Sequence, residues 1–139
     1  GNLYKSGNRL LLAGECKEKM YFISGSDFGK TVVAALKTDN AVNIDYDVQG
    51  PEAYTADQAV QIFKDNYTKE KLKISKAPFA MLKMLAPFST KINYGRHILE
   101  ALNNYPEKFT SENTWKDLHK PVTTVKDYVS GLNSKANEN

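Results

Sequence analysis

The sequence predicts an α/β protein, α+β in isolation, in which a few short strands are followed by a group of helices. The length of 139 residues fits one domain, and 41% hydrophobic with 25% charged residues supplies one core and argues against disorder. Strand and helix periodicities alternate in the first half of the chain, whereas the second half shows only helical periodicity. This order resembles the closing part of a doubly wound sheet with a helical cap behind it.

The first half contains six expected elements, four strands and two helices. They are a hairpin over 9–13 and 19–23, a helix opened by Ser26 or Asp27, a strand over 43–48, a helix after Thr55, and a strand over 71–75. The strand over 43–48 is expected because polar and apolar residues alternate there. Thr55 with Gln58 has the spacing of a capping box, which begins many helices.

The second half is expected to be helical. Pro78 and Pro87 bound a helix whose segment Phe79–Leu85 is apolar nearly all round, so we expect it to be deeply buried or packed on a surface absent from this chain. Further helices are expected before Pro106, around Trp115 and after Thr124. We therefore divide the chain into the end of a sheet region (1–75), a helical C-terminal region (76–132) and a disordered tail (133–139).

Composition disfavours several classes of partner. The net charge is only +3 and arginine occurs twice, so we expect no nucleic-acid partner. The lysines at 69, 71, 73 and 76 alternate with Leu72 and Ile74, which favours the outer face of a strand over an anion-binding patch. No apolar run approaches the ~20 residues that span a bilayer, so no membrane partner is expected.

Cysteine and histidine are sparse. Cys16 is the only cysteine, which excludes an intrachain disulfide and favours a reducing, cytoplasmic location. His97, His119 and Cys16 are not at ligand spacing from one another, so we expect no metal site.

Two groups of polar residues are candidates for binding a substrate. One is Tyr94, Arg96 and His97, because a guanidinium binds carboxylate or phosphate and an imidazole transfers protons. The alternative is that they lie on a solvated helix face. The other is Ser24 and Ser26, which follow a strand and precede a helix, where open α/β sheets bind ligands. Their alternative is helix capping.

Three segments resemble a known superfamily. They are Tyr21–Lys30 (strand, Ser-x-x-Asp, helix), Tyr46–Thr55 (strand, Gly-Pro-Glu-x-hydrophobic-Thr, helix) and Trp115–Thr124 (Leu-x-x-Pro-x-Thr-Thr, helix). In this order they resemble the C-terminal part of extended and atypical short-chain dehydrogenase/reductase proteins, the NAD(P)-binding superfamily that includes NAD-dependent epimerases. Gly29 stands where the family usually has Ala, and His119 where Gly is common.

The resemblance implies what this chain lacks. The Gly-rich cofactor turn is absent, and the Tyr-x-x-x-Lys spacing of Tyr67 and Lys71 is discounted because Lys71 is expected to begin a strand. We therefore expect the C-terminal fragment of a Rossmann-like oxidoreductase or epimerase-like parent. By itself it should have no catalytic residue and no cofactor, and NAD or NADP should bind to the parent.

The expected partner is the missing N-terminal, cofactor-binding half, with self-association possible through Phe79–Leu85. Three alternatives stay open: a non-catalytic NAD(P) sensor, an unrelated interaction domain that uses Phe79–Leu85, and a natural stand-alone domain.

Overall fold

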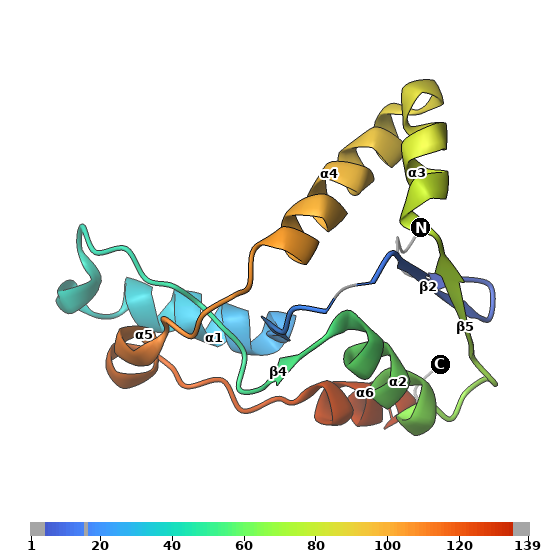
Figure 1. Cartoon of the computed structure of the whole chain (residues 1–139). Helices are drawn as coiled ribbons and strands as arrows, with labels where there is room; N and C mark the ends of the chain where they lie inside the picture. Colours follow the sequence, from blue (N-terminus) through green and yellow to red (C-terminus); the bar gives the residue numbers. More distant parts are fainter. Residues whose placement is uncertain (1–4, 16, 135–139) are drawn as a thin grey trace. The chain divides into compact units, whose positions relative to one another are not determined.

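The structure is a computed structural model that describes residues 5–15 and 17–134, and it is a mixed α/β protein (Figure 1). Its strands are β1 (Lys5–Ser6), β2 (Arg9–Ala13), β3 (Met20–Tyr21), β4 (Ala53–Tyr54) and β5 (Lys73–Ala77). Its helices are α1 (Gly25–Leu36), η1 (Asp39–Ala41), α2 (Ala56–Asn66), α3 (Phe79–Leu85), η2 (Ala86–Phe88), α4 (Thr90–Asn104), α5 (Glu112–Asp117) and α6 (Val125–Ser134).

The main sheet has the order β1-β2-β5. β2 runs antiparallel to β1 and parallel to β5, with Leu10 opposite Ile74. The expected hairpin of 9–13 with 19–23 is wrong, because β1 and β5 occupy the two edges of β2. Gly7, at a φ of 56°, lies in the tight turn from β1 to β2, and the N–H of Gly14 donates to Ala77 and continues the pairing with β5.

The expected strand over 43–48 is also wrong, since residues 44–50 have no regular secondary structure. Asn43 adopts a left-handed φ of 58°, which interrupts an extended run. The carbonyl of Asp47 accepts hydrogen bonds from the hydroxyls of Ser111 and Thr114 instead of from a neighbouring strand. The alternating segment 43–48 is therefore fixed by hydrogen bonds from side chains, not by pairing with another strand.

The helix starts at Thr55 and Thr124 are confirmed. Thr55 and Gln58 form both hydrogen bonds of a capping box at the start of α2. Thr124 accepts from the N–H of Asp127, whose carboxylate accepts from the N–H of Thr124. The start of α1 is corrected: its N-cap is Ser24, not Ser26 or Asp27.

The chain forms two compact units that interleave along the sequence. Unit 1 comprises 1–20 and 54–107, and unit 2 comprises 21–53 and 108–139. The expected boundary between residues 75 and 76 falls inside β5. Of the expected tail, residues 133 and 134 belong to α6, and 135–139 lie outside the described residues.

The apolar core is small. Among the described residues, the buried hydrophobic side chains are Leu10, Ala59, Leu72, Ala86 and Val129. Seventeen large hydrophobic side chains of the described residues are exposed, several of them on α1 and on α3. The described chain thus leaves much of its apolar surface uncovered.

In unit 1, α3 and α4 form an antiparallel helical hairpin joined by η2, with its closed end away from the β2–β5 pair (Figure 1). The expectation that Phe79–Leu85 could be deeply buried is wrong, because none of the seven side chains of α3 is buried. Within the described ranges, no helix has the length and apolar character needed to cross a membrane.

Candidate functional site

The N-terminus of α1 carries the first cluster of polar groups. The chain turns from β3 into α1 at Ser24, whose hydroxyl accepts a hydrogen bond from the N–H of Asp27 at 3.0 Å. This bond satisfies one of the N–H groups that a helix start leaves unpaired. Ser24 is buried, so capping is the role that its contacts show. Ser26 is exposed and lines a shallow depression along α1 together with Lys30.

The side chain of Asp27 is fully buried and binds four donors. Its Oδ2 accepts from the backbone N–H groups of Val122 and Thr123, at 3.2 and 2.8 Å. Its Oδ1 lies 3.0 Å from Nζ of Lys30 and 3.3 Å from Nε2 of His119. We call these five residues the Asp27 clamp. The clamp joins α1 to the turn before α6 and supplies partners for a buried charge.

The hydrogen bonds of the clamp keep Asp27 ionised. Burial by itself raises the pKa of a carboxyl group, because it disfavours the charged form. Here the bonds from Thr123, Lys30 and His119 outweigh burial and hold the pKa of Asp27 well below its ordinary value. The carboxylate is therefore negatively charged at neutral pH, at the start of α1 where the helix dipole also favours it.

A second buried cluster surrounds Gln49 in unit 2. Its Oε1 accepts from the N–H of Thr110 at 2.7 Å and from the hydroxyl of Ser111 at 3.2 Å, and its Nε2 donates to the carbonyl of Lys108 at 2.8 Å. The indole N–H of Trp115 donates to the carbonyl of Gln49 at 3.4 Å. Gln49 therefore ties the segment before Gly50 to the segment that leads into α5.

Gly50 is required by close backbone contact. A Cβ at this position would lie 1.7 Å from the carbonyl oxygen of Phe22, a distance that no side chain can accept. The N–H of Gly50 donates to the carbonyl of Tyr21 at 3.4 Å. The ring of Tyr21 in turn packs on Phe109, 5.4 Å between ring centres.

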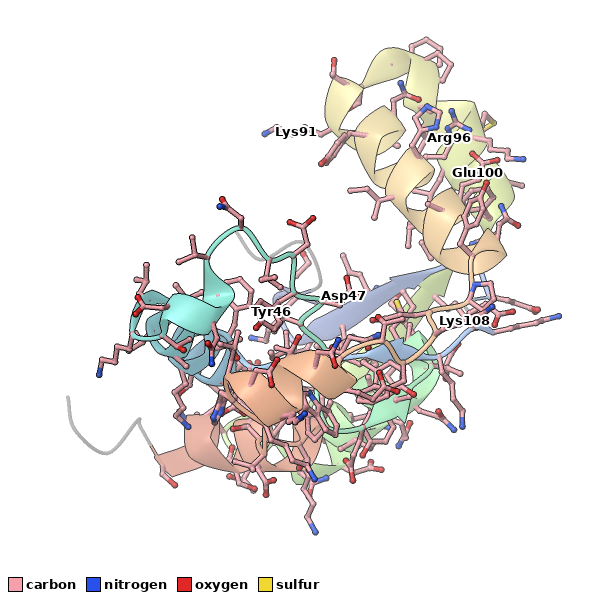
Figure 2. The ribbon with its side chains drawn as sticks, turned by 90° about the vertical axis from the view of Figure 1, so that its left-hand side faces the viewer. Tyr46, Asp47, Lys91, Arg96, Glu100 and Lys108 are labelled. Atoms are coloured by element: carbon pink, nitrogen blue, oxygen red, sulfur yellow. The ribbon has the colours of Figure 1, made fainter. Side chains whose placement is uncertain are left out.

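The predicted group of Tyr94, Arg96 and His97 lies on α4 in unit 1. Arg96 donates to Glu100 at 3.0 Å and to Asn93 at 3.4 Å, and its Nη2 lies 2.8 Å from Nε2 of His97. Figure 2 shows Arg96 and Glu100 on the same side of the hairpin. Arg96 also lines a shallow depression with Lys83, Thr90 and Asn93, whereas Tyr94 is 70% exposed.

The structure thus brings together Arg96 and His97, whereas Ser24 and Ser26 belong to the other unit. The described residues include no group of three or more His, Cys, Asp or Glu side chains able to hold a metal ion. His119 beside buried Asp27 has the geometry of an imidazole oriented by a carboxylate. The contacts described for His119 include no serine or cysteine side chain that could serve as a nucleophile.

Sequence reasoning missed the partners of Asp27 and Gln49. Asp27 was expected to cap one helix, and Thr123 or Thr124 to begin another. Nothing in the sequence near Asp27 indicates that its carboxylate binds the N–H of Thr123. The sequence held no signal for the partners of Gln49, since Lys108, Thr110 and Ser111 lie outside the segments that carry the resemblance. Comparison of the sequence with protein-family models and with curated proteins finds no match.

Proposed function

We propose that this chain is the substrate-binding C-terminal part of an NAD(P)-dependent oxidoreductase or epimerase-like protein of the short-chain dehydrogenase/reductase superfamily, and that it is not catalytic alone. The observation that carries the proposal is the mutual contact of the three segments on which the resemblance rests. Residues 27, 49–50 and 115–123 come from those segments, and unit 2 joins them through hydrogen bonds that are partly buried where a side chain takes part.

The parallel pairing of β2 with β5 supports the α/β part of the proposal. Parallel strands need a long connection, and here the connection contains a helix, α2, that contacts both strands. The connection also contains β3, α1, η1 and β4, whereas in Rossmann-like proteins shorter strand–helix–strand units repeat to make a larger sheet. We propose that the remaining strands belong to the missing N-terminal half.

The exposed apolar surface supports a larger parent. On α1 the exposed side chains include Phe28, Val33 and Leu36, and Leu36 is 82% exposed. A stand-alone domain of this length normally buries more of its apolar side chains than the five found among the described residues. We propose that the N-terminal half covers the apolar face of α1.

We propose that a dinucleotide cofactor binds to the other half of the parent rather than at the N-terminus of α1 or α2. Pyrophosphate binds at the N-terminus of a helix, where free N–H groups and the helix dipole attract it. α1 and α2 each follow a short strand, but both carry an acidic residue in the first turn, Asp27 and Asp57. Asp27 is a buried anion in that place and would repel phosphate.

We propose that Tyr94, Arg96 and His97 of unit 1 contact the substrate in the parent. Separately, we propose Ser26 of unit 2 as a substrate contact, whereas Ser24 caps α1. Arg96 and His97 share a carboxylate partner, Glu100, so a substrate anion would have to compete with it. The shallow depressions that contain Arg96 and Ser26 are open on one side, as expected of walls that another part of the protein completes.

Titration calorimetry tests this function. The 139-residue chain is expected to bind neither NADH nor NADPH, whereas the product of the longer reading frame is expected to bind one of them. Micromolar binding by the chain alone would contradict the assignment of the cofactor to the missing half. An upstream sequence without a Gly-rich turn would overturn the family proposal.

The same upstream sequence separates the two versions of the proposal. A Gly-rich turn together with a Tyr-x-x-x-Lys pair supports an enzyme, and the longer protein should then consume NAD(P)H or NAD(P)+ with a substrate. The Gly-rich turn without that pair supports a non-catalytic NAD(P) sensor, which should bind the nucleotide without turnover.

A further inference from the structure

The closed end of the α3–α4 hairpin exposes large apolar side chains. Phe88 in η2 is 86% exposed and Met84 in α3 is 68% exposed, and Leu85 beside them is also exposed. Single exposed hydrophobic residues are common on proteins, but here three lie within five consecutive positions around one turn. We call Met84, Leu85 and Phe88 the hairpin tip.

The sequence around the tip has only one sign of charge. Residues 71–99 contain five lysines and one arginine and no aspartate or glutamate. Two of the six basic side chains are paired with acidic residues outside this stretch, Lys76 with Asp57 and Arg96 with Glu100. The described contacts give no acidic partner to the two lysines of the hairpin, Lys83 and Lys91.

These two lysines flank the tip along the chain, one on each helix. Nζ of Lys83 lies 5.3 Å from the centre of the Phe79 ring, which orders the side chain without neutralising it. Lys91, in the first turn of α4, extends away from both helices (Figure 2). Along the chain, the apolar tip therefore lies between two lysines to which the described contacts give no acidic partner.

We propose that the hairpin tip docks on the surface of an anionic phospholipid bilayer. Apolar side chains enter the boundary between headgroups and acyl chains, while lysines remain at the level of the anionic headgroups. Such docking needs no spanning segment, so it is compatible with the lack of a long apolar run. The cytoplasmic leaflet carries anionic lipid, which fits the location expected from the single cysteine.

Charge complementarity favours this occupant over a second copy of the chain. Two tips brought together would place four lysines near one another without acidic partners, and like charges repel. An acidic protein would satisfy the lysines, and the test below includes it. The proposal does not depend on the cofactor proposal above, because it rests on the hairpin alone.

Vesicle co-sedimentation of the 139-residue chain tests the docking. We expect binding to vesicles of phosphatidylcholine with phosphatidylglycerol, weak or no binding to phosphatidylcholine alone, and a loss of binding as salt is added. Replacing Lys83 and Lys91 with Gln should weaken binding about fivefold for each lysine. Met84→Ser with Phe88→Ser should weaken it at unchanged charge.

A matched control uses exposed apolar residues elsewhere. Val33→Ser with Leu36→Ser on α1 removes two exposed hydrophobic side chains from unit 2 and should leave vesicle binding unchanged. Circular dichroism of each variant checks that the helices persist. Equal binding to neutral vesicles, or equal loss in the α1 control, would show general stickiness and overturn the proposal.

Two further results would indicate that the hairpin tip binds a partner other than a bilayer. Binding to soluble polyglutamate that survives Met84→Ser with Phe88→Ser would indicate an acidic macromolecule. A dimer in analytical ultracentrifugation that Phe88→Ser dissociates, without vesicle binding by the original chain, would indicate a second copy. Either result contradicts lipid docking.

Discussion

The segment around Asp27 and the α3–α4 hairpin use polar side chains in different ways. The buried carboxylate of Asp27 accepts a hydrogen bond from the N–H of Thr123, 96 positions away in the sequence. In the described part of the hairpin, the side-chain hydrogen bonds join only near neighbours in the sequence. They link residues three or four positions apart, or the adjacent Arg96 and His97. The first arrangement determines tertiary structure, whereas the second supports a local helix.

This difference has a consequence for function. A buried charge with several fixed donors is costly to disturb, so the Asp27 clamp is suited to positioning the surrounding segments. The hairpin has exposed side chains and local bonds, which suits a surface that contacts a substrate, a lipid or another protein. Substitutions that change one region without the other can test this division.

The largest expected effect comes from Asp27→Asn. The amide keeps one acceptor but loses the charge that Lys30 and His119 stabilise, and it places an NH₂ group against backbone donors. We expect a loss of about 3 kcal/mol in the stability of unit 2. Native-state hydrogen exchange should show faster exchange at Val122 and Thr123, with α3 and α4 unchanged.

The matched control is Asp127→Asn, which replaces the exposed carboxylate that caps α6 with Thr124. Its effect should be smaller and confined to the first turn of α6. Equal effects of the two variants would mean that the buried clamp has no special role.

Acid should affect the two regions unequally. The folded pKa of Asp27 is lowered, so its contribution to stability is fully present above its unfolded pKa of about 4 and is lost as the pH falls below that value. Protection of the Thr123 amide should therefore decline below about pH 4. In the Asp27→Asn variant this decline should be reduced, and a decline of the same size would contradict the assignment.

Gly50→Ala is expected to destabilise unit 2 by about 2 kcal/mol, because the new Cβ collides with backbone at Phe22 and the chain must shift. Thermal unfolding followed by the fluorescence of Trp115 would measure it, since Trp115 contacts the adjacent Gln49. Gly29→Ala on α1 is a control, as its Cβ would meet open space. Equal melting temperatures for Gly50→Ala and the original chain would disprove the contact.

The smallest effect is expected for Arg96→Ala in the hairpin. Its ion pair with Glu100 is partly exposed and joins positions i and i+4 of one helix, so we expect a loss of about 0.5 kcal/mol or less. Helix content by circular dichroism should barely change. A loss comparable to that of Asp27→Asn would show that Arg96 has partners beyond α4 and would remove the contrast between the regions.

Local chemistry allowed part of the fold to be predicted. The starts of α2 and α6 depend on Thr55 and Thr124 bonding to N–H groups three residues ahead, a geometry that needs no other segment. The strand over 9–13 was correct in position but not in partner. Its neighbour β5 lies more than sixty residues away, and the pairing of distant strands leaves no local trace.

The candidate site shows the same limit. Arg96 and His97 could be grouped from sequence because they are adjacent on one helix. The roles of Gln49 and Gly50 could not be predicted from the sequence. Gln49 binds residues 108, 110 and 111, which are distant in the sequence, and Gly50 is required because the backbone of Phe22 passes close to it.

By itself, the sequence determined where α2 and α6 begin, that residues 71–99 lack acidic side chains, and that one cysteine excludes an intrachain disulfide. These features depend on near neighbours or on composition. Only the tertiary structure decided that residues 44–48 are held by Ser111 and Thr114 rather than by a strand, and that the carboxylate of Asp27 is buried against Val122 and Thr123. The reason is physical: a buried polar group must find a partner, and the fold determines which distant group supplies it.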